Sequence, residues 1–338
     1  MNPPRSPPKP ATLHDVAREA GVSLITASRA LGNPGVVSDS TIGRVLEAVT
    51  KTGYIPNLLA GGLKSKRSMT VAGLVPVISV PQFLPTIRSL TDSLDAAGYQ
   101  LILGQTGYAN SREDKLLNTM ISRRPDGIVI TGLVSSPATR EMLTRLGVPI
   151  VEMWDLSDRP VDMVVGFSHL KVGSAIAGFF LNKGWRRVGI ATGDDHRAMT
   201  RREGFCAVVG DVPSAIVPAP SNLEMGRRAL AELLQKDPKL EAVYCSSDEF
   251  ALGAIIEAQS RGLRVPGDIA ICGFGDADFA AHLMPSLTTV QVDGAAIGKL
   301  AAQLIIDRCA GRPVGKRIVD VGFRIVERDS TGGATLHR

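Results

Sequence analysis

The chain has 338 residues, of which 44% are hydrophobic and 21% charged, a composition typical of globular proteins rather than disordered ones. Its length exceeds the size at which one hydrophobic core stops growing, so two or three domains are expected. Its apolar runs are too short to cross a membrane, and the Pro-rich first ten residues lack the apolar stretch of a secretory signal. We therefore expect a cytoplasmic protein.

The net charge of +5 is concentrated at one end of the chain. Residues 1–70 contain nine Lys and Arg against four Asp and Glu, whereas the remaining 268 residues carry 29 groups of each sign. A compact basic module on a neutral body is typical of proteins that bind the phosphate backbone of nucleic acids. A solvated basic face without a partner is the alternative that charge alone leaves open.

Three short helices are predicted near the N-terminus. Apolar residues at helical spacing follow Thr12, which can cap the first helix, and Gly21 ends it. A second helix, capped by Ser23, is predicted from Leu24 to Leu31, and a third from about Ser38 to Gly53. Two helices joined by a tight turn that contains glycine form a helix-turn-helix unit.

This segment resembles the headpiece of the LacI/GalR family of transcriptional regulators. The resemblance rests on TLHDVAREAGVSLITASRAL from Thr12, on Val37-Ser38 and on GYIPN from Gly53, which occur in the family's order and spacing. It implies that the second helix enters the major groove of DNA and that a homodimer binds a nearly palindromic operator.

The resemblance places Leu24 and Ile25 at the two positions that the family uses most to read bases. Apolar side chains can contact thymine methyl groups but make no bidentate hydrogen bonds to guanine or adenine. Specificity is therefore expected to depend also on Thr26, Ser28, Arg29 and DNA shape. Core packing is the alternative for the two apolar residues. The expected DNA contacts are Thr12, Ser23, Leu24, Ile25, Thr26, Ser28, Arg29, Asn33, Tyr54, Asn57, Ala60 and Leu63, with Ser28 and Arg29 on phosphates.

Residues 57–69 match the family's hinge helix and linker. The resemblance implies that this helix orders on operator DNA, lies in the minor groove and inserts Leu63 between base pairs, with Ala60 at a close contact. Gly61 and Gly62 are unusual there, because each glycine costs about 1 kcal/mol relative to alanine in a helix. We expect the hinge to be disordered without DNA.

From Val71 onward, short apolar runs alternate with amphipathic helices. This alternation predicts parallel sheets with helices on both faces, and its length favours two Rossmann-like lobes. Strands are predicted at 71–75, 99–103, 127–131, 149–153, 188–192, 242–245 and 269–274, and helices include 82–97, 171–183 and 249–261.

Motifs such as GWRRVGIATG, SSDEFALGA and VPGDIAICGFGD resemble the family's core, which has two lobes like those of periplasmic sugar-binding proteins. The expected fold is therefore α/β, with a helix-turn-helix headpiece and a two-lobed core crossed near residues 165, 290 and 322. The expected parts are a disordered arm at 1–10, the headpiece at 11–56, the hinge at 57–69, the core at 70–330 (N-lobe about 70–164 and 291–321, C-lobe about 165–290 and 322–330) and a tail at 331–338.

Ligands of such folds bind between the lobes, at the carboxyl ends of the strands. The family's arginine three residues before a helical glycine matches Arg201, whose guanidinium suits a carboxylate or two neighbouring hydroxyls. A surface arginine beside Arg202 is the alternative. The family's second polar marker falls on Gly275, which argues against a simple neutral sugar. Effector contacts are expected at Ser79, Gln82, Gln105, Tyr108, Trp154, Asp155, Arg201, Ser247, Asp248 and Asp276.

The run VPIVEMWD and the Gly107-Tyr108 pair are most similar to the gluconate-operon repressors of the family. Together with Arg201 they favour a sugar acid, such as gluconate, as the effector of a repressor of a carbohydrate-utilisation operon. A periplasmic-type sugar-binding protein and a sugar-processing α/β enzyme are the alternatives, but neither accounts for the basic headpiece.

No catalytic or metal-binding constellation is apparent. The five histidines lack metal-ligand spacing, and no G-x-S-x-G or Walker sequence occurs. Asp194-Asp195-His196 is explained by a polar loop after a strand. We expect no cofactor, no metal and no enzymatic activity. The cysteines lack C-x-x-C spacing and are expected to be plain thiols: Cys206, Cys245, Cys272 and Cys309.

Overall fold

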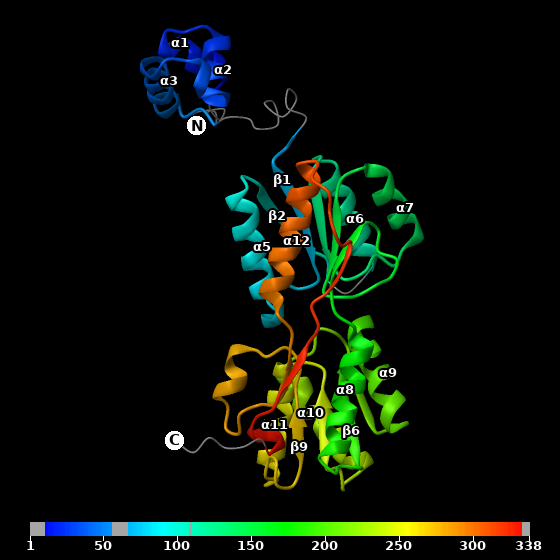
Figure 1. Ribbon diagram of the computed structural model, residues 1–338. Coiled ribbons are helices and arrows are strands. Elements are labelled where there is room, and N and C mark those ends of the chain that lie inside the picture. Colours follow the sequence, from blue (N-terminus) through cyan, green and yellow to red (C-terminus); the bar gives the residue numbers. More distant parts are fainter. Residues whose placement is uncertain (1–10, 56–66, 108–109, 333–338) are drawn as a thin grey trace, which may run out of the picture. The chain divides into compact units, whose positions relative to one another are not determined.

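The computed structural model describes residues 11–55, 67–107 and 110–332. Contacts within the chain divide it into two units, Met1–Ser68 and Met69–Arg338, each of which is described by itself (Figure 1). The expected N-terminal arm, most of the hinge and most of the tail lie outside the described residues. No helix in the described part of the chain is long and apolar enough to span a bilayer.

The first unit is the three-helix headpiece that the sequence predicts. It contains α1 (Leu13–Ala20), α2 (Leu24–Gly32) and α3 (Asp39–Thr52), with a short 3-10 turn, η1 (Pro34–Val36), before α3. The apolar positions whose spacing predicts the helices face one another and form a small core. Its buried members are Val16, Ala20, Ala30, Val45 and Ala48.

Local side-chain bonds fix where these helices begin and end. The Asp15 carboxylate accepts hydrogen bonds from the backbone N–H of Thr12 (2.9 Å) and from its hydroxyl (2.7 Å). Gly21, at φ 64°, ends α1 in the left-handed conformation that favours glycine. Two residues after Gly21, the Ser23 hydroxyl accepts the backbone N–H of Thr26 (3.1 Å) and caps the start of α2. The turn between α1 and α2 is therefore tight.

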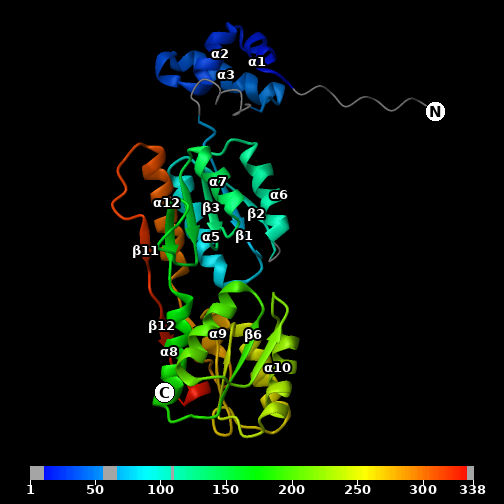
Figure 2. The same cartoon turned by 90° about the vertical axis from the view of Figure 1, so that its right-hand side faces the viewer.

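One lobe of the second unit is a six-stranded parallel sheet in the order β11-β5-β4-β3-β1-β2. Helices α5 (Leu84–Ala96) and α12 (Gly294–Cys309) cover one face, and α6 (Asn110–Ile121) and α7 (Pro137–Leu146) cover the other (Figure 2). The strands are β1 (Thr70–Val75), β2 (Gln100–Gln105), β3 (Gly127–Thr131), β4 (Ile150–Met153), β5 (Met163–Gly166) and β11 (Ile318–Asp320).

The other lobe is a four-stranded parallel sheet in the order β7-β6-β8-β9. Helices α8 (His169–Asn182) and α9 (His196–Val209) pack on one face, and α10 (Leu223–Lys236) and α11 (Asp248–Ser260) on the other. The strands are β6 (Val188–Gly193), β7 (Ser214–Val217), β8 (Ala242–Cys245) and β9 (Ala270–Cys272).

The chain passes between the two sheets after β5, after β10 (Thr289–Gln291) and after β11, and β10 pairs antiparallel with β12 (Arg324–Val326) at the junction. One continuous apolar cluster joins the lobes. Within it Phe167 contacts Trp154 and Phe274, with ring centroids 6.0 and 6.2 Å apart. The two lobes therefore share part of their core.

Every predicted strand is present, with ends shifted by up to two residues, but the described residues contain five further strands that are not predicted. These are β5, β7, β10, β11 and β12, each of three or four residues. Such strands are too short for periodicity to separate them from loops. β7 lies in the stretch 205–217, where the family usually has a longer helix and loop.

Candidate nucleic-acid interface and ligand pocket

The second helix of the headpiece, α2, presents two apolar side chains to solvent. Ala27 and Ala30 face the headpiece core, whereas Leu24 and Ile25 are 37% and 65% exposed. Core packing, the alternative reading of these two residues, is therefore wrong. Exposed apolar tips at the start of a helix are suited to the methyl groups of thymine.

Two polar residues of α2 are exposed and available to DNA. Ser28 and Arg29 are exposed, and Arg29 forms no ion pair with another described residue, whereas Arg18 and Lys51 pair with Asp15 and Glu19. Arg29 is thus available to a phosphate. The backbone N–H groups at the start of α2 add a second group of donors that favours anions.

The remaining predicted DNA contacts have more local roles. Thr26 is half-buried, and its hydroxyl lies 2.8 Å from that of Ser23, so both belong to the cap of α2. Thr12 and Asn33 are exposed at helix ends, and Tyr54 is half-buried against the headpiece core. The hinge contacts Asn57, Ala60 and Leu63 lie outside the described residues and stay predictions.

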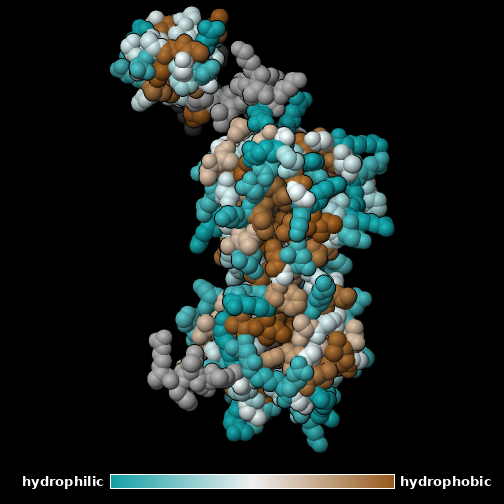
Figure 3. Space-filling model, in the orientation of Figure 1, coloured by the Kyte–Doolittle hydropathy of each residue, from teal (hydrophilic) through white to brown (hydrophobic). Residues whose placement is uncertain are grey.

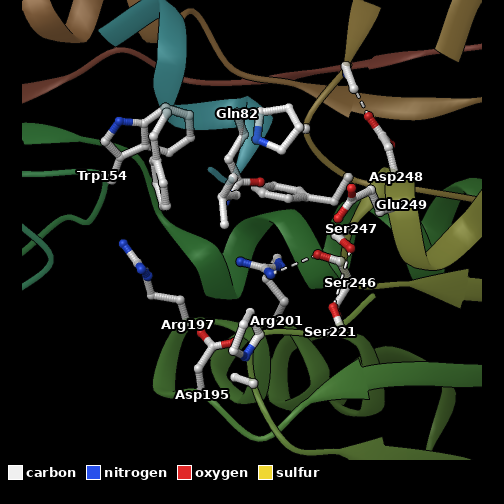
Figure 4. A pocket seen from close by; sticks show the side chains of 18 of the residues that line it. Gln82, Trp154, Asp195, Arg197, Arg201, Ser221, Ser246, Ser247, Asp248 and Glu249 are labelled. Carbon is white, nitrogen blue, oxygen red and sulfur yellow. Dashed lines mark hydrogen bonds between the residues drawn. The ribbon is translucent and has the colours of Figure 1, made fainter. Parts of the chain in front are cut away.

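A cavity lies between the lobes of the second unit (Figure 4). Its walls come from residues just after β4, β6, β8 and β9, where carboxyl ends of parallel strands meet. Five of the predicted effector contacts line it: Gln82, Trp154, Arg201, Ser247 and Asp248.

Arg201 is held rigidly in the wall of this cavity. Its side chain is 5% exposed, so the alternative of a surface arginine is wrong. Its Nε donates to the Tyr244 hydroxyl (3.0 Å) and its Nη2 to the backbone carbonyl of Ser246 (3.1 Å). The guanidinium carbon lies 4.1 Å from the centroid of the Phe274 ring, a cation–π contact. The positive charge is fixed from several sides.

His169 connects Arg201 to the opposite lobe. Its Nε2 lies 2.9 Å from the backbone carbonyl oxygen of Trp154, which can only accept, so Nε2 carries the proton and Nδ1 accepts from Nη1 of Arg201 (3.0 Å). Burial and the positive charge of Arg201 hold the pKa of His169 well below 6.5. The imidazole is therefore a neutral link between the lobes.

Trp154 continues this chain of bonds into the six-stranded lobe. Its Nε1 donates to the Thr86 hydroxyl (2.9 Å), which donates to the backbone carbonyl of Gly294 (2.8 Å) at the start of α12. Trp154 adopts φ 64°, a conformation that costs a non-glycine residue of order 1–3 kcal/mol. The hydrogen bond to Thr86 and the packing of the indole against Phe83, with ring centroids 5.0 Å apart, hold the residue in this conformation.

Arg197 lies one turn before Arg201 on α9 and lines the same cavity. Its Nη1 atom is buried and has no hydrogen-bond partner among the described residues. Leaving a buried donor unpaired costs about 1–3 kcal/mol, and more for a charged group. The guanidinium carbon lies 5.4 Å from the Phe83 ring centroid, so this arginine of one lobe reaches an aromatic ring of the other.

Asp248 is a buried carboxylate at the start of α11. Its two oxygens accept from the Thr289 hydroxyl (2.5 Å) and from the backbone N–H of Ala277 (2.7 Å). Burial raises its pKa from 3.8 to about 6, against the effect of these bonds. Gly275, which stands in place of the family's polar marker, has φ 129°, a conformation that would strain any other residue type at this position. Asp248 thus ties the loop after β9 to the cavity wall.

The other predicted effector contacts lie outside this cavity. Asp155 lines an adjoining hollow of about 990 Å³ that also contains Arg197. Asp276 lies in an outer hollow, paired with Arg328 at 2.7 Å, so a neighbouring cation already occupies its carboxylate. Gln105 accepts from the N–H of Ile78 (3.3 Å), and Ser79 is exposed away from the lining. Tyr108 lies outside the described residues.

Sequence reasoning missed several lining residues: His169, Asp195, Arg197, Ser221, Ser246 and Glu249. The spacing of Arg197, four residues before Arg201, was the available signal, because residues at that spacing share one helix face. His169 follows β5, a strand too short to predict, so its approach to Arg201 had no sequence signal.

Comparison with known proteins agrees with both units. Residues 12–57 match the lacI family of bacterial regulatory proteins, and residues 177–331 match a periplasmic binding protein-like domain. The HTH-type transcriptional regulator GntR of Pseudomonas aeruginosa is 33% identical over 327 residues, which are 95% of each chain. The chain belongs to the LacI family of DNA-binding transcriptional regulators.

Solved structures support the same assignment. A LacI-family transcriptional regulator from Silicibacter pomeroyi superimposes with a TM-score of 0.90 at 34% identity, over 95% of this chain and 99% of that one. The regulator CelR, in complex with cellobiose, gives a TM-score of 0.68 at 25% identity over 95% and 99%. The named relatives are transcriptional regulators and not enzymes, as the sequence predicts.

Proposed function

We propose that this LacI-family regulator represses a carbohydrate-utilisation operon in the cytoplasm and that a sugar acid of the gluconate type is its effector. The observation that carries the sugar-acid proposal is the pair of arginines on α9, of which Arg197 has a buried nitrogen with no partner among the described residues. A carboxylate would supply that partner and balance the positive charge. The cellobiose complex of CelR supports a carbohydrate in a core of this fold.

The rest of the cavity suits the carbon chain of such a ligand. Phe83, Trp154 and Phe274 provide apolar faces for C–H groups, and Ser221 and Ser247 provide hydroxyls. Ligand pockets of this kind combine apolar walls with a few polar groups that fix orientation. A polyhydroxy acid satisfies both Arg197 and the serines, whereas a neutral sugar would leave the charge of Arg197 without a counter-ion on the ligand.

We propose that two copies of the chain bind a pseudo-palindromic operator, with α2 of each copy in the major groove and the hinge residues Asn57, Ala60 and Leu63 in the minor groove. Exposed apolar residues on the second unit, including Leu84 on α5 (47%), Leu300 on α12 (37%) and Met284 (90%), support a self-association surface. Figure 3 shows apolar side chains among the polar ones on the face of the second unit that carries α5 and α12.

In this proposal, the ligand changes the arrangement of the two lobes and thereby the order of the hinge helices. Arg201, His169 and Trp154 support this coupling, because their hydrogen bonds run from one lobe into the other. Ligand and operator must then alter each other's affinity by the same factor, typically 1–3 kcal/mol in coupling free energy.

Calorimetric titration of the purified full-length protein tests the ligand class. The panel is gluconate, ketogluconates, neutral hexoses and purines, and we expect only sugar acids to bind. Arg201→Ala should weaken binding, because Arg201 fixes the cavity wall, whereas Arg202→Ala, one residue along α9, should not, because Arg202 bonds to Ser214 instead of lining the cavity. Binding of neutral sugars or purines alone would overturn the proposed effector but not the DNA-binding function.

A further inference from the structure

We propose that Arg197, and not Arg201, binds the anionic group of the effector, and that Arg201 is a positioning residue. This inference rests on the proposed sugar-acid function and names the residue that makes the site select an acid. It follows from the hydrogen bonds that the guanidinium nitrogen atoms of the two arginines form with the protein.

The donors of Arg201 are largely committed to the protein. Nε carries a single hydrogen, which the Tyr244 hydroxyl accepts, so the fork formed by Nε and Nη2 is closed to a carboxylate. Nη1 and Nη2 each donate to a further fixed partner, His169 and the Ser246 carbonyl. The ring of Phe274 covers one face of the guanidinium. Rotating Arg201 toward a ligand would break bonds that are themselves buried.

The donors of Arg197 are not committed in this way. Nη1 is buried without a partner among the described residues, although the side chain as a whole is only half-buried. Contact with the Phe83 ring holds the guanidinium across the cleft, where it lines both the main cavity and the adjoining hollow. A guanidinium that lines a cavity and has a buried nitrogen without an acceptor among the described residues is suited to an acceptor on a ligand.

The charges around the cavity give a ligand one orientation. In Figure 4, Arg197 lies on one side of the cavity with Asp195 near it, and Asp248 and Glu249 lie on the other. The Asp195 carboxylate caps α9, where it accepts the backbone N–H of Ala198 (3.2 Å). An anionic group is attracted to Arg197 and repelled by Asp248 and Glu249, to whose carboxylates hydroxyl groups can donate. The carboxylate of a sugar acid would therefore lie at Arg197, with its hydroxyl-bearing chain directed toward the start of α11.

Binding of three matched probes to the full-length protein tests this assignment. D-gluconate, D-gluconamide and D-glucitol share one polyhydroxy chain and differ in the group at C1. The carboxylate of gluconate can form charge-assisted hydrogen bonds where the amide of gluconamide forms weaker ones. We therefore expect the wild type to bind gluconate about tenfold to a hundredfold more tightly than gluconamide. Arg197→Met should reduce this preference to within about threefold, and Arg197→Lys, which keeps the charge but not the fork, should give an intermediate value.

Two control variants separate the assignment from its alternatives. Arg202→Met makes the same substitution on the same helix outside the cavity and should keep the wild-type preference. Arg201→Met should weaken binding of all three probes by similar factors and lower the melting temperature, as expected of a positioning residue. Melting temperatures of the Arg197 variants close to that of the wild type would show that their pockets are intact.

The outcomes distinguish this inference from the proposed function. A wild-type protein that does not prefer gluconate over gluconamide would overturn the sugar-acid function. A wild-type preference that persists in Arg197→Met, or that is lost selectively in Arg201→Met, would overturn the assignment of Arg197 while leaving that function intact.

Discussion

The two functional surfaces of this regulator are built in opposite ways. On α2 of the headpiece, Leu24 and Ile25 are exposed, and short-range caps at Thr12 and Ser23 fix the helices. In the pocket, charged side chains are buried and held by bonds between segments far apart in sequence, such as Arg201 with His169. The proposed DNA-reading surface can therefore be altered at little cost in stability, whereas the pocket cannot.

Removal of the buried arginine should destabilise the second unit. Arg201→Met leaves the Tyr244 hydroxyl, His169 Nδ1 and the Ser246 carbonyl without their present donor. We expect the free energy of unfolding to fall by about 3 kcal/mol, since each unpaired buried group costs about 1–3 kcal/mol and relaxation recovers part of the sum. Urea unfolding followed by fluorescence measures this, because both tryptophans, Trp154 and Trp185, lie in the second unit. A urea midpoint equal to that of the wild type would contradict this expectation.

A smaller effect is expected from the pH dependence of the pocket. Burial raises the pKa of Asp248 from 3.8 to about 6, so the folded state binds its proton more tightly than the unfolded state. This carboxyl therefore destabilises the fold increasingly as the pH rises from about 4 through 6. Asp248→Asn should gain on the order of 2 kcal/mol relative to the wild type between pH 4.5 and pH 7.5. Unfolding free energies of both proteins at the two pH values test the sign.

The exposed apolar pair should affect DNA reading without affecting stability. Ile25→Ala removes side-chain carbons that we expect against a thymine methyl, and operator affinity should fall by about 1 kcal/mol, roughly fivefold. Replacing the contacted thymine by uracil should weaken the wild type but not the variant. Melting temperatures should be equal within error, as Ile25 is 65% exposed. If the uracil substitution weakens operator binding by both proteins equally, Ile25 does not contact the thymine methyl.

The smallest effect is expected at Arg29, whose proposed partner is a phosphate. Arg29→Gln should weaken binding to all sequences alike and reduce the slope of log K against log salt by about 0.9, the value for one lost phosphate contact on duplex DNA. Fluorescence anisotropy at several salt concentrations measures the slope. Loss of discrimination between operator and mismatched sites, with the slope unchanged, would assign Arg29 to a base instead.

The same comparison explains how much the sequence could predict. The headpiece was predictable because its information is local: helix periods, caps at Thr12 and Ser23, and Gly21 at φ 64°. The alternating strands and helices of the core were predictable for the same reason. The short strands β5 and β12 were not, since their pairing depends on neighbours far along the chain.

Half of the predicted effector contacts line the pocket, and they were found through the positions that follow strands and through Arg201. The rest depends on tertiary contacts that no spacing shows. Asp276 follows a strand as Asp248 does, but Arg328, 52 residues further on, pairs with it. Whether a polar residue is free for a ligand depends on which partner the fold brings to it.

We propose that the pocket of the second unit controls DNA binding by the first. It is tested most directly by the affinity of the full-length protein for its operator, measured by fluorescence anisotropy with and without saturating gluconate. We predict that gluconate weakens operator binding by about 5- to 150-fold, and that operator weakens gluconate binding by the same factor. Equal operator affinity in the presence and absence of bound gluconate would contradict the account.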